Sequence, residues 1–157
     1  MERIDGRSDG AGMRVAIVAA RFNDLIVDRL LDGALMALRS HGVRDDDLIA
    51  VRVPGAVELP LLAQALADRD DIDAVVALGC VIRGATSHYD YVCQMVASGI
   101  ARVGLEASKP VIFGVLTTEN LGQAFDRAGG KLGNKGAEAA LAAIQTASAL
   151  RDVRALG

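Results

Sequence analysis

The sequence is poor in the residues that most often build metal centres and disulfide frameworks. It has only two cysteines and two histidines, and Cys80 and Cys93 show no C-x-x-C spacing and no histidine pair beside them. A structural zinc site and a disulfide scaffold are therefore not indicated. We expect Cys80 and Cys93 to be reduced, buried thiols.

The chain also lacks a block of charge of one sign and a long apolar run. Its formal net charge is -3, and no signature of an RNA-binding or DNA-binding domain is present, so nucleic acid is not an expected partner. No apolar run reaches the roughly 18 residues of a membrane span. The opening residues, MERIDGRSDGAG, have acids and glycines where a signal peptide needs an apolar core. We expect a cytoplasmic protein with no membrane partner that acts on small molecules.

Apolar residues, in contrast, are abundant. They make up 52% of the 157 residues, which is high for a chain without a membrane span. The length suits one domain with a real core, and we attribute the apolar excess to an interface between subunits. Only residues 1–12 show no pattern. We therefore expect a flexible segment over residues 1–12, followed by one α/β domain over residues 13–157.

Four β-branched apolar runs alternate with helical patterns along the chain. We expect strands over residues 13–20, 48–53, 74–82 and 110–116. Helical stripes follow each of these runs, and a last helix is expected to begin near Gly136. Thr117 or Thr118 is the expected N-cap of the fourth helix, which ends near Arg127. The alternation predicts a three-layer sandwich with a four-stranded parallel sheet in the flavodoxin-like order 2-1-3-4 and helices on both faces.

A sheet of this kind binds ligands beyond the carboxyl ends of its strands. The segments expected there are RFND, PGAVE, RGATSH and TTEN, one after each strand in turn. Phe22, at the end of the first strand, is poorly placed for the core and well placed to stack on a planar ligand. Phe113, inside the fourth strand, is by its position alone expected to be a core residue.

The segment RGATSH offers a phosphate-binding turn and a base. Backbone N–H groups and the positive end of a helix dipole suit an oxyanion, although a polar turn capped by Thr86 or Ser87 would have the same composition. His88 at the helix start would favour its neutral form, a usable base, or it is simply a surface histidine. Glu58 either complements a helix dipole or accepts hydrogen bonds from ligand hydroxyls.

Basic residues are unevenly distributed. The chain has 14 arginines and only three lysines, and two of the lysines, Lys131 and Lys135, lie in GGKLGNKG close to Arg127. The segment lacks G-x-x-x-x-G-K-[ST] and follows a helix, so it is not a P-loop. The spacing leaves open whether it is a binding segment or a solvated connection between helices.

Five motifs in order, RFND, VPGAVELP, ALGCVIRGATSHYDYVC, FGVLTTEN and DRAGGKLGNKGAEAALAAI, closely resemble the lumazine synthase family over about Met13 to Ala149. The resemblance implies an enzyme of riboflavin biosynthesis that uses no cofactor. Its substrates would be 5-amino-6-(D-ribitylamino)uracil and 3,4-dihydroxy-2-butanone 4-phosphate, and its products 6,7-dimethyl-8-ribityllumazine, phosphate and water. Two alternatives stay open: a flavin-binding or lumazine-binding module without turnover, and a shell-forming protein with a vestigial site.

The resemblance also implies roles for individual residues. Phe22 would stack on the pyrimidine, and His88 would transfer protons. Other contacts within the same subunit would come from the ribityl-chain residues Ala56, Val57 and Glu58, the pyrimidine-edge backbone of Cys80, Val81 and Ile82, and the phosphate ligands Ala85 and Thr86. The neighbouring subunit would add Phe113, Arg127 on the phosphate, and Lys135.

Members of the family form pentamers with sites at subunit interfaces, and some assemble into 60-subunit icosahedral shells. The segment GGKLGNKG has the short form found in shell-forming members, and the resemblance makes riboflavin synthase a candidate partner. One departure is Val57, because many relatives carry phenylalanine there. This difference puts the affinity for the ribityl chain in doubt more than the activity.

Overall fold

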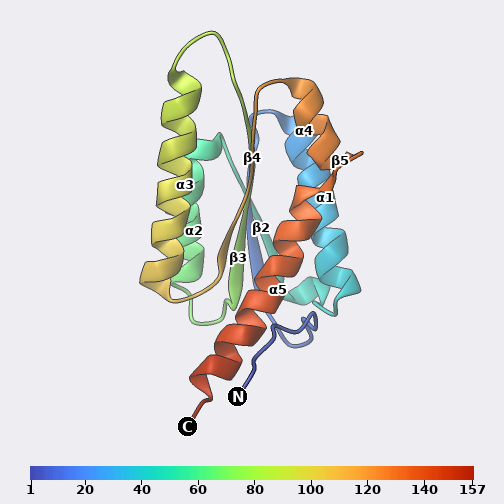
Figure 1. Cartoon of the computed structure of the whole chain (residues 1–157), viewed down its shortest axis with the longest axis vertical. Helices are drawn as coiled ribbons and strands as arrows, with labels where there is room; N and C mark the ends of the chain where they lie inside the picture. The colour runs from blue at the N-terminus through green and yellow to red at the C-terminus, as the bar shows by residue number, and fades with distance from the viewer.

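The centre of the molecule is a parallel sheet of four strands. In the computed structural model, which describes residues 1–157, the strands are β1 (Val15–Ala20), β2 (Leu48–Val53), β3 (Ala74–Ile82) and β4 (Val111–Thr118). They lie in the order β2-β1-β3-β4, which confirms the predicted topology (Figure 1). All of β1 and most of β3 are buried because these central strands are covered on both faces.

Helices form the two outer layers of the sandwich. One face carries α2 (Leu59–Ala67) and α3 (His88–Ala107), and the other carries α1 (Asp24–Ser40), α4 (Leu121–Arg127) and α5 (Lys135–Arg154) (Figure 1). Each face holds its own buried apolar cluster. The sheet is thus fixed from both sides, and its carboxyl edge is a rigid frame for the loops that leave it.

Three short elements were not expected from the sequence. Two 3-10 turns, Asp45–Asp47 and Ala56–Glu58, precede β2 and α2, and a two-stranded hairpin, β5 (Ala128–Gly130) with β6 (Gly133–Asn134), lies between α4 and α5. The hairpin needs glycine at Gly129 and Gly133, whose φ angles are 99° and 82°. Because its strands are two and three residues long, they have no apolar alternation to reveal them.

Two other expectations were wrong. Thr117 and Thr118 do not cap α4, because both pair with β3 inside β4; the cap is Asn120, whose side chain accepts a hydrogen bond from the Gln123 backbone N–H at 2.9 Å. Cys93 is only half-buried, whereas Cys80 is buried as expected. Both cysteines are free thiols.

The start of α5 packs against α1 through small residues. A β-carbon added to Gly136 would overlap the backbone carbonyl of Leu30, and one added to Gly33 would overlap the side chain of Asn134. Asn134 accepts a hydrogen bond from the Ala137 N–H and donates one to the Arg29 carbonyl, each at 3.0 Å. This close contact fixes the hairpin and the first turn of α5 on α1.

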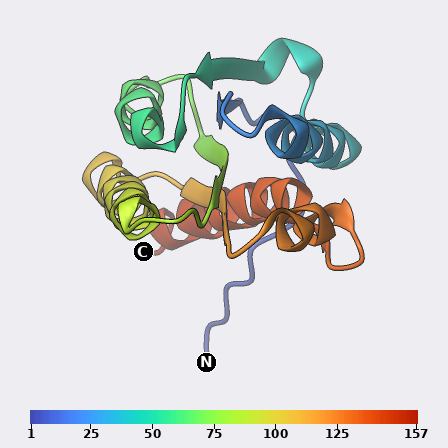
Figure 2. The ribbon, with the colours of Figure 1, turned by 90° about the horizontal axis from the view of Figure 1, so that it is seen from above.

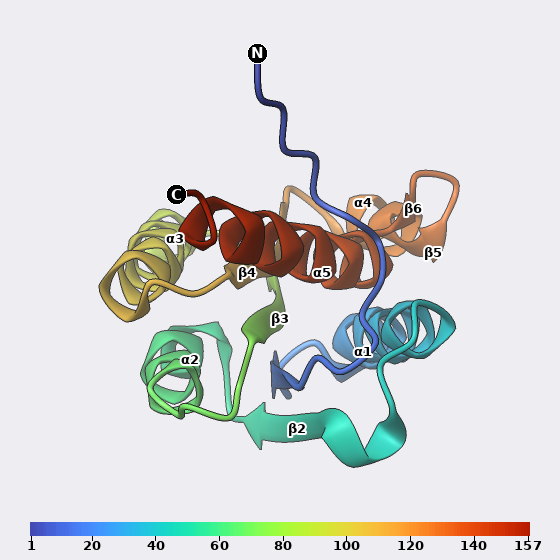
Figure 3. The same cartoon turned by 90° about the horizontal axis from the view of Figure 1, so that it is seen from below.

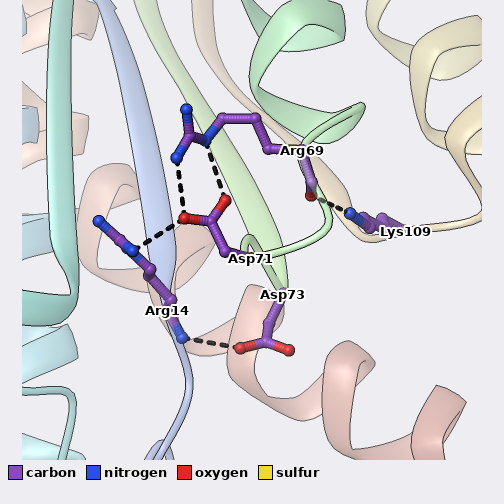
Figure 4. A network of polar contacts seen from close by, with 5 residues as sticks. All are labelled: Arg14, Arg69, Asp71, Asp73 and Lys109. Atoms are coloured by element: carbon purple, nitrogen blue, oxygen red, sulfur yellow. Dashed lines mark hydrogen bonds and ion pairs between the residues drawn. The ribbon is translucent and has the colours of Figure 1, made fainter.

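The amino edge of the sheet ends in a network of ion pairs. Asp71 accepts hydrogen bonds from Arg14 at 2.8 Å and from Arg69 at 2.8 and 2.9 Å (Figure 4). Asp73 accepts a hydrogen bond from the Arg14 N–H at 2.7 Å, and Lys109 donates to the Arg69 carbonyl. The network ties the start of β1 to the loops before β3 and β4.

Both chain ends lie near this same edge (Figures 1 and 3). Residues 1–12 form no helix or strand, and Arg7 pairs with Asp152 of α5. His41, at the end of α1, places its Nδ1 2.7 Å from the Ala37 carbonyl oxygen, a local contact at a helix end. No helix combines the length and the apolarity needed to cross a membrane.

Candidate active site

A cavity of about 380 Å³ opens at the carboxyl edge of the sheet. Its walls come from the segments after β1, β2 and β3 and from the first turns of α3. Nine of the residues predicted from the sequence for one subunit line it: Phe22, Ala56, Val57, Glu58, Cys80, Val81, Ile82, Thr86 and His88. Ala85, the remaining predicted residue, lies exposed in the turn beside the cavity and does not line it.

Phe22 presents its ring at the cavity instead of burying it. Its side chain is 73% exposed, and its N–H donates to the Pro54 carbonyl at 3.0 Å, which ties the segment after β1 to the segment after β2. The next residue, Asn23, has a left-handed backbone with φ of 60°, and its side-chain amide donates to the Cys80 carbonyl at 2.8 Å. The aromatic face is therefore held in place by the backbone and remains free to stack on a planar ligand.

Glu58 stands at the start of α2 with part of its carboxylate free. Oε2 accepts a hydrogen bond from the Gly55 N–H at 3.0 Å, and the other oxygen makes no hydrogen bond within the chain. Val57, beside it, is 41% exposed. An exposed carboxylate oxygen next to an apolar side chain suits a ligand with hydroxyl groups on a carbon chain.

The end of β3 contributes backbone rather than reactive side chains. Burial raises the pKa of the Cys80 thiol to about 11, so this thiol is protonated at neutral pH and is not a nucleophile. Val81 and Ile82 are half-buried apolar residues. The backbone N–H and C=O groups of these residues are therefore the polar groups that the end of β3 can offer to the edge of a ligand ring.

The turn over residues 84–87 lies exposed above the cavity and leads into α3. The Thr86 hydroxyl accepts a hydrogen bond from the His88 N–H at 3.3 Å, and the Ser87 side chain makes no capping bond. A β-carbon at Gly84 would meet open space, so packing does not explain the glycine. The imidazole of His88 is exposed and makes no hydrogen bond within the chain. The turn can thus accept an anion, and the imidazole is free to accept a proton.

The other predicted residues line a second cavity. It has a volume of about 430 Å³ and lies between β4, the hairpin and the start of α5, where it is lined by Phe113, Arg127 and Lys135 together with Glu138. Arg127 donates a hydrogen bond to the Gln123 carbonyl at 2.9 Å, and Lys135 makes no ion pair. Lys131 lies outside this cavity, 3.7 Å from Asp126.

No residue lines both cavities. Viewed onto the carboxyl edge, α2 and α3 lie on one side of the sheet, and α4 and the hairpin lie on the other (Figure 2). The first cavity offers an aromatic face, a carboxylate, an imidazole and a turn rich in N–H groups, whereas the second offers an arginine and a lysine. One chain alone therefore holds the two parts of the predicted site apart.

Several residues of the two cavities were missed from the sequence. Asn23 adjoins Phe22, and Glu138 lies one helical turn after Lys135, so neighbouring positions and helical spacing could have found both. Tyr89 also lines the first cavity, although an aromatic residue in a helix gives no such signal. No group of three or more metal-ligating side chains lies together in the molecule.

Comparison with known protein families gives one match that spans both cavities. The family model described as 6,7-dimethyl-8-ribityllumazine synthase matches residues 12–151. The matched segment contains all four strands of the sheet and every residue discussed above as part of either cavity.

Proposed function

The chain belongs to the 6,7-dimethyl-8-ribityllumazine synthase family, whose members are transferases of riboflavin biosynthesis, and we propose that it catalyses the reaction of that name. It condenses 5-amino-6-(D-ribitylamino)uracil with 3,4-dihydroxy-2-butanone 4-phosphate to 6,7-dimethyl-8-ribityllumazine, phosphate and water. The observation that carries the proposal is the first cavity, in which Phe22, Glu58 and His88 converge. A planar ring, a polyhydroxy chain and an acidic carbon each find a suitable side chain there.

In this proposal the pyrimidine stacks on Phe22, and its edge meets the backbone of residues 80–82. The ribityl chain runs past residues 56–58, where the free oxygen of Glu58 accepts its hydroxyls. The phosphate lies at Ala85 and Thr86, where N–H groups at the start of the 20-residue helix α3 face it. Ala85 contributes backbone only, which is consistent with its position outside the cavity wall.

The chemistry consists of Schiff-base formation with loss of one water, loss of phosphate to an enol, tautomerisation, and ring closure with loss of a second water. His88 accepts and returns protons on the carbons next to the imine. Holding two substrates together contributes up to about 7–11 kcal/mol in favourable cases, and one general base contributes roughly 10²–10⁴-fold in rate. Positioning is therefore the larger part of the catalysis, and no step needs a cofactor.

The second cavity belongs to the site of the adjacent subunit in this proposal. Arg127 there binds the phosphate, while Phe113 and Lys135 close the pocket over the substrates. Support comes from the separation of the two cavities in one chain and from the free outer edge of β4. Large exposed apolar side chains on α3, Tyr91, Met95 and Leu105, provide further surface that a neighbour would cover.

This split site requires contact between neighbouring subunits, and we propose that five of them form a ring. The short GGKLGNKG connection suits a 60-subunit shell of such pentamers, with riboflavin synthase as a candidate partner. Sedimentation of the active enzyme tests the first step, and we expect activity only in the assembled fraction. A monomer with full activity would refute the shared site.

The decisive test of the reaction mixes the purified protein with both substrates and follows lumazine fluorescence against the spontaneous background. We expect a rate well above that background. A protein that only carries flavin or lumazine would bind tightly and give no product, and a shell protein with a vestigial site would do neither. A rate equal to the background would overturn the proposal.

A further inference from the structure

Arg83 is the first residue after β3, and it connects three segments around the first cavity without lining it. Its Nε donates to Glu119 in the loop after β4 at 2.7 Å. Its two terminal nitrogens face the Asp90 carboxylate at 3.3 and 3.5 Å, and its guanidinium lies over the Tyr89 ring at 4.3 Å from the centroid. One side chain thus ties the end of β3 to the first turn of α3 and to the end of β4.

The backbone of Arg83 takes part in the same junction. Its N–H donates to the Thr118 carbonyl at 2.9 Å, which extends the pairing of β3 with β4 by one residue. Arg83 is therefore fixed at both its main chain and its side chain. Hydrogen bonds to Asp90 and Glu119 also raise its pKa above the ordinary value, so the guanidinium keeps its charge.

The turn over residues 84–87 has no comparable attachment. All four of its residues are exposed, and Thr86 makes the one side-chain hydrogen bond within it. The path of the turn is therefore set by its two ends, β3 and the first turn of α3. Arg83 connects those ends directly, because Tyr89 and Asp90 immediately follow His88 in the helix.

We propose that Arg83 is a positioning residue that holds the 84–87 turn and His88 in register with the cavity. The proposal rests on the proposed function, since it assigns the turn to phosphate and His88 to proton transfer. Arg83 is not assigned to the phosphate itself, because its Nε and both terminal nitrogens already face carboxylates. The carboxylates of Asp90 and Glu119 occupy these donors, so a phosphate would have to displace one of them to reach the guanidinium.

Arginine suits this place better than lysine would. A planar guanidinium can stack on Tyr89 while its edge donates to two carboxylates in different directions, whereas an ammonium group offers one compact charge. Lysine at this position would keep an ion pair with one carboxylate and lose the shared geometry. This difference makes the conservative variant informative.

The test compares Arg83→Met and Arg83→Lys with the wild type, using Arg102→Met as the control. Arg102 lies on α3, the helix whose first turn contacts Arg83, and pairs with Glu106 away from the cavity. We expect Arg83→Met to lower kcat and to raise the KM for the butanone phosphate, each by about tenfold, because small displacements of positioned groups are costly. The KM for the pyrimidine should change by less than about twofold, because Phe22 and residues 56–58 are held separately.

The two other variants and a binding measurement complete the test. Arg83→Lys should restore part of kcat, and Arg102→Met should match the wild type. Calorimetry with inorganic phosphate should show weaker binding to Arg83→Met than to the wild type. This readout does not depend on turnover.

The failures of the two proposals are distinguishable. If the wild type forms no product, the proposed function fails whatever Arg83 does. If the wild type is active and folded Arg83→Met keeps both kcat and KM, or raises both KM values equally, the positioning role is refuted. Should Arg83→Met fail to fold, Glu119→Gln, which removes one carboxylate partner, decides by the same comparison.

Discussion

The two edges of the central sheet use charged residues in opposite ways. At the amino edge, Arg14 and Arg69 both pair with Asp71 (Figure 4). At the carboxyl edge, His88 and Lys135 make no ion pair or side-chain hydrogen bond, and Glu58 keeps one oxygen free. The side chains at the carboxyl edge that are free of ion pairs can meet a ligand, whereas the ion-paired side chains at the amino edge hold the fold.

Arg83 lies at the carboxyl edge, but its side chain is paired with two carboxylates. Like the amino-edge arginines it pairs with carboxylates, whereas the turn it holds has a single side-chain hydrogen bond, from the His88 N–H to the Thr86 hydroxyl. The carboxyl edge therefore also needs fixed residues, and these lie next to the groups that contact the ligand.

The largest effect is expected from removing the free imidazole. His88→Ala should lower kcat by about 10²-fold and leave measurable activity, because positioning of the substrates survives. Steady-state rates with both substrates measure this, and His41→Ala, the only other histidine, is the matched control and should keep the wild-type rate. Complete loss of activity with substrate binding intact would contradict the positioning argument.

An intermediate effect is expected from removing the cation of the second cavity. Arg127→Ala should raise the KM for the butanone phosphate by roughly 10–50-fold, which corresponds to about 1.5–2.3 kcal/mol for a charge-assisted hydrogen bond. The KM for the pyrimidine should change little. Lys131→Ala is the control, since Lys131 lies nearby and outside the cavity. An equal rise in both KM values for Arg127→Ala would remove Arg127 from the phosphate.

The smallest effect is expected at the amino edge, and it concerns stability alone. Asp71→Asn should lower the thermal midpoint by about 1–3 °C at pH 7, because the ion pairs are partly exposed. Both kinetic constants should stay at wild-type values. A clear change in kcat would show that a substitution at the amino edge alters the site at the carboxyl edge. The two edges would then not have separate roles.

The pH dependence sharpens this prediction. Hydrogen bonding to Arg69 lowers the pKa of Asp71 below its ordinary value near 4. Its contribution is therefore present above that ordinary value and is lost as the pH falls through the lowered folded-state pKa. The difference in thermal midpoint between Asp71→Asn and the wild type should shrink in acid, and a difference that grows in acid would contradict the assignment.

Most of the fold could be predicted because its signals are local. Buried strands such as β3 are continuous apolar runs, and the rules for crossover connections then leave few sheet orders. The hairpin between α4 and α5 could not be predicted, because its strands are too short for a period and its glycines are equally typical of a loop. The cap of α4 was misplaced because Thr117 and Thr118 are good caps and good strand residues alike.

The candidate site was predictable where the segments directly after the strands carry the chemistry. Phe22, Glu58 and His88 each follow a strand, so the topology alone gathers them at one edge. The division of the predicted residues between two cavities required the structure, because the sequence gives no distance between β3 and the hairpin. The partners of Arg83 were equally hidden, since Glu119 lies 36 residues away along the chain.

The separation of the two cavities has a consequence for mixtures of two defective variants. If each site takes one cavity from each of two neighbours, a chain defective at His88 and a chain defective at Arg127 damage different halves. When the two variants are refolded together, about a quarter of the sites in a randomly mixed ring combine two undamaged halves. Two impaired proteins would then give more activity together than either gives alone, which is not expected of an enzyme whose whole site lies inside one chain.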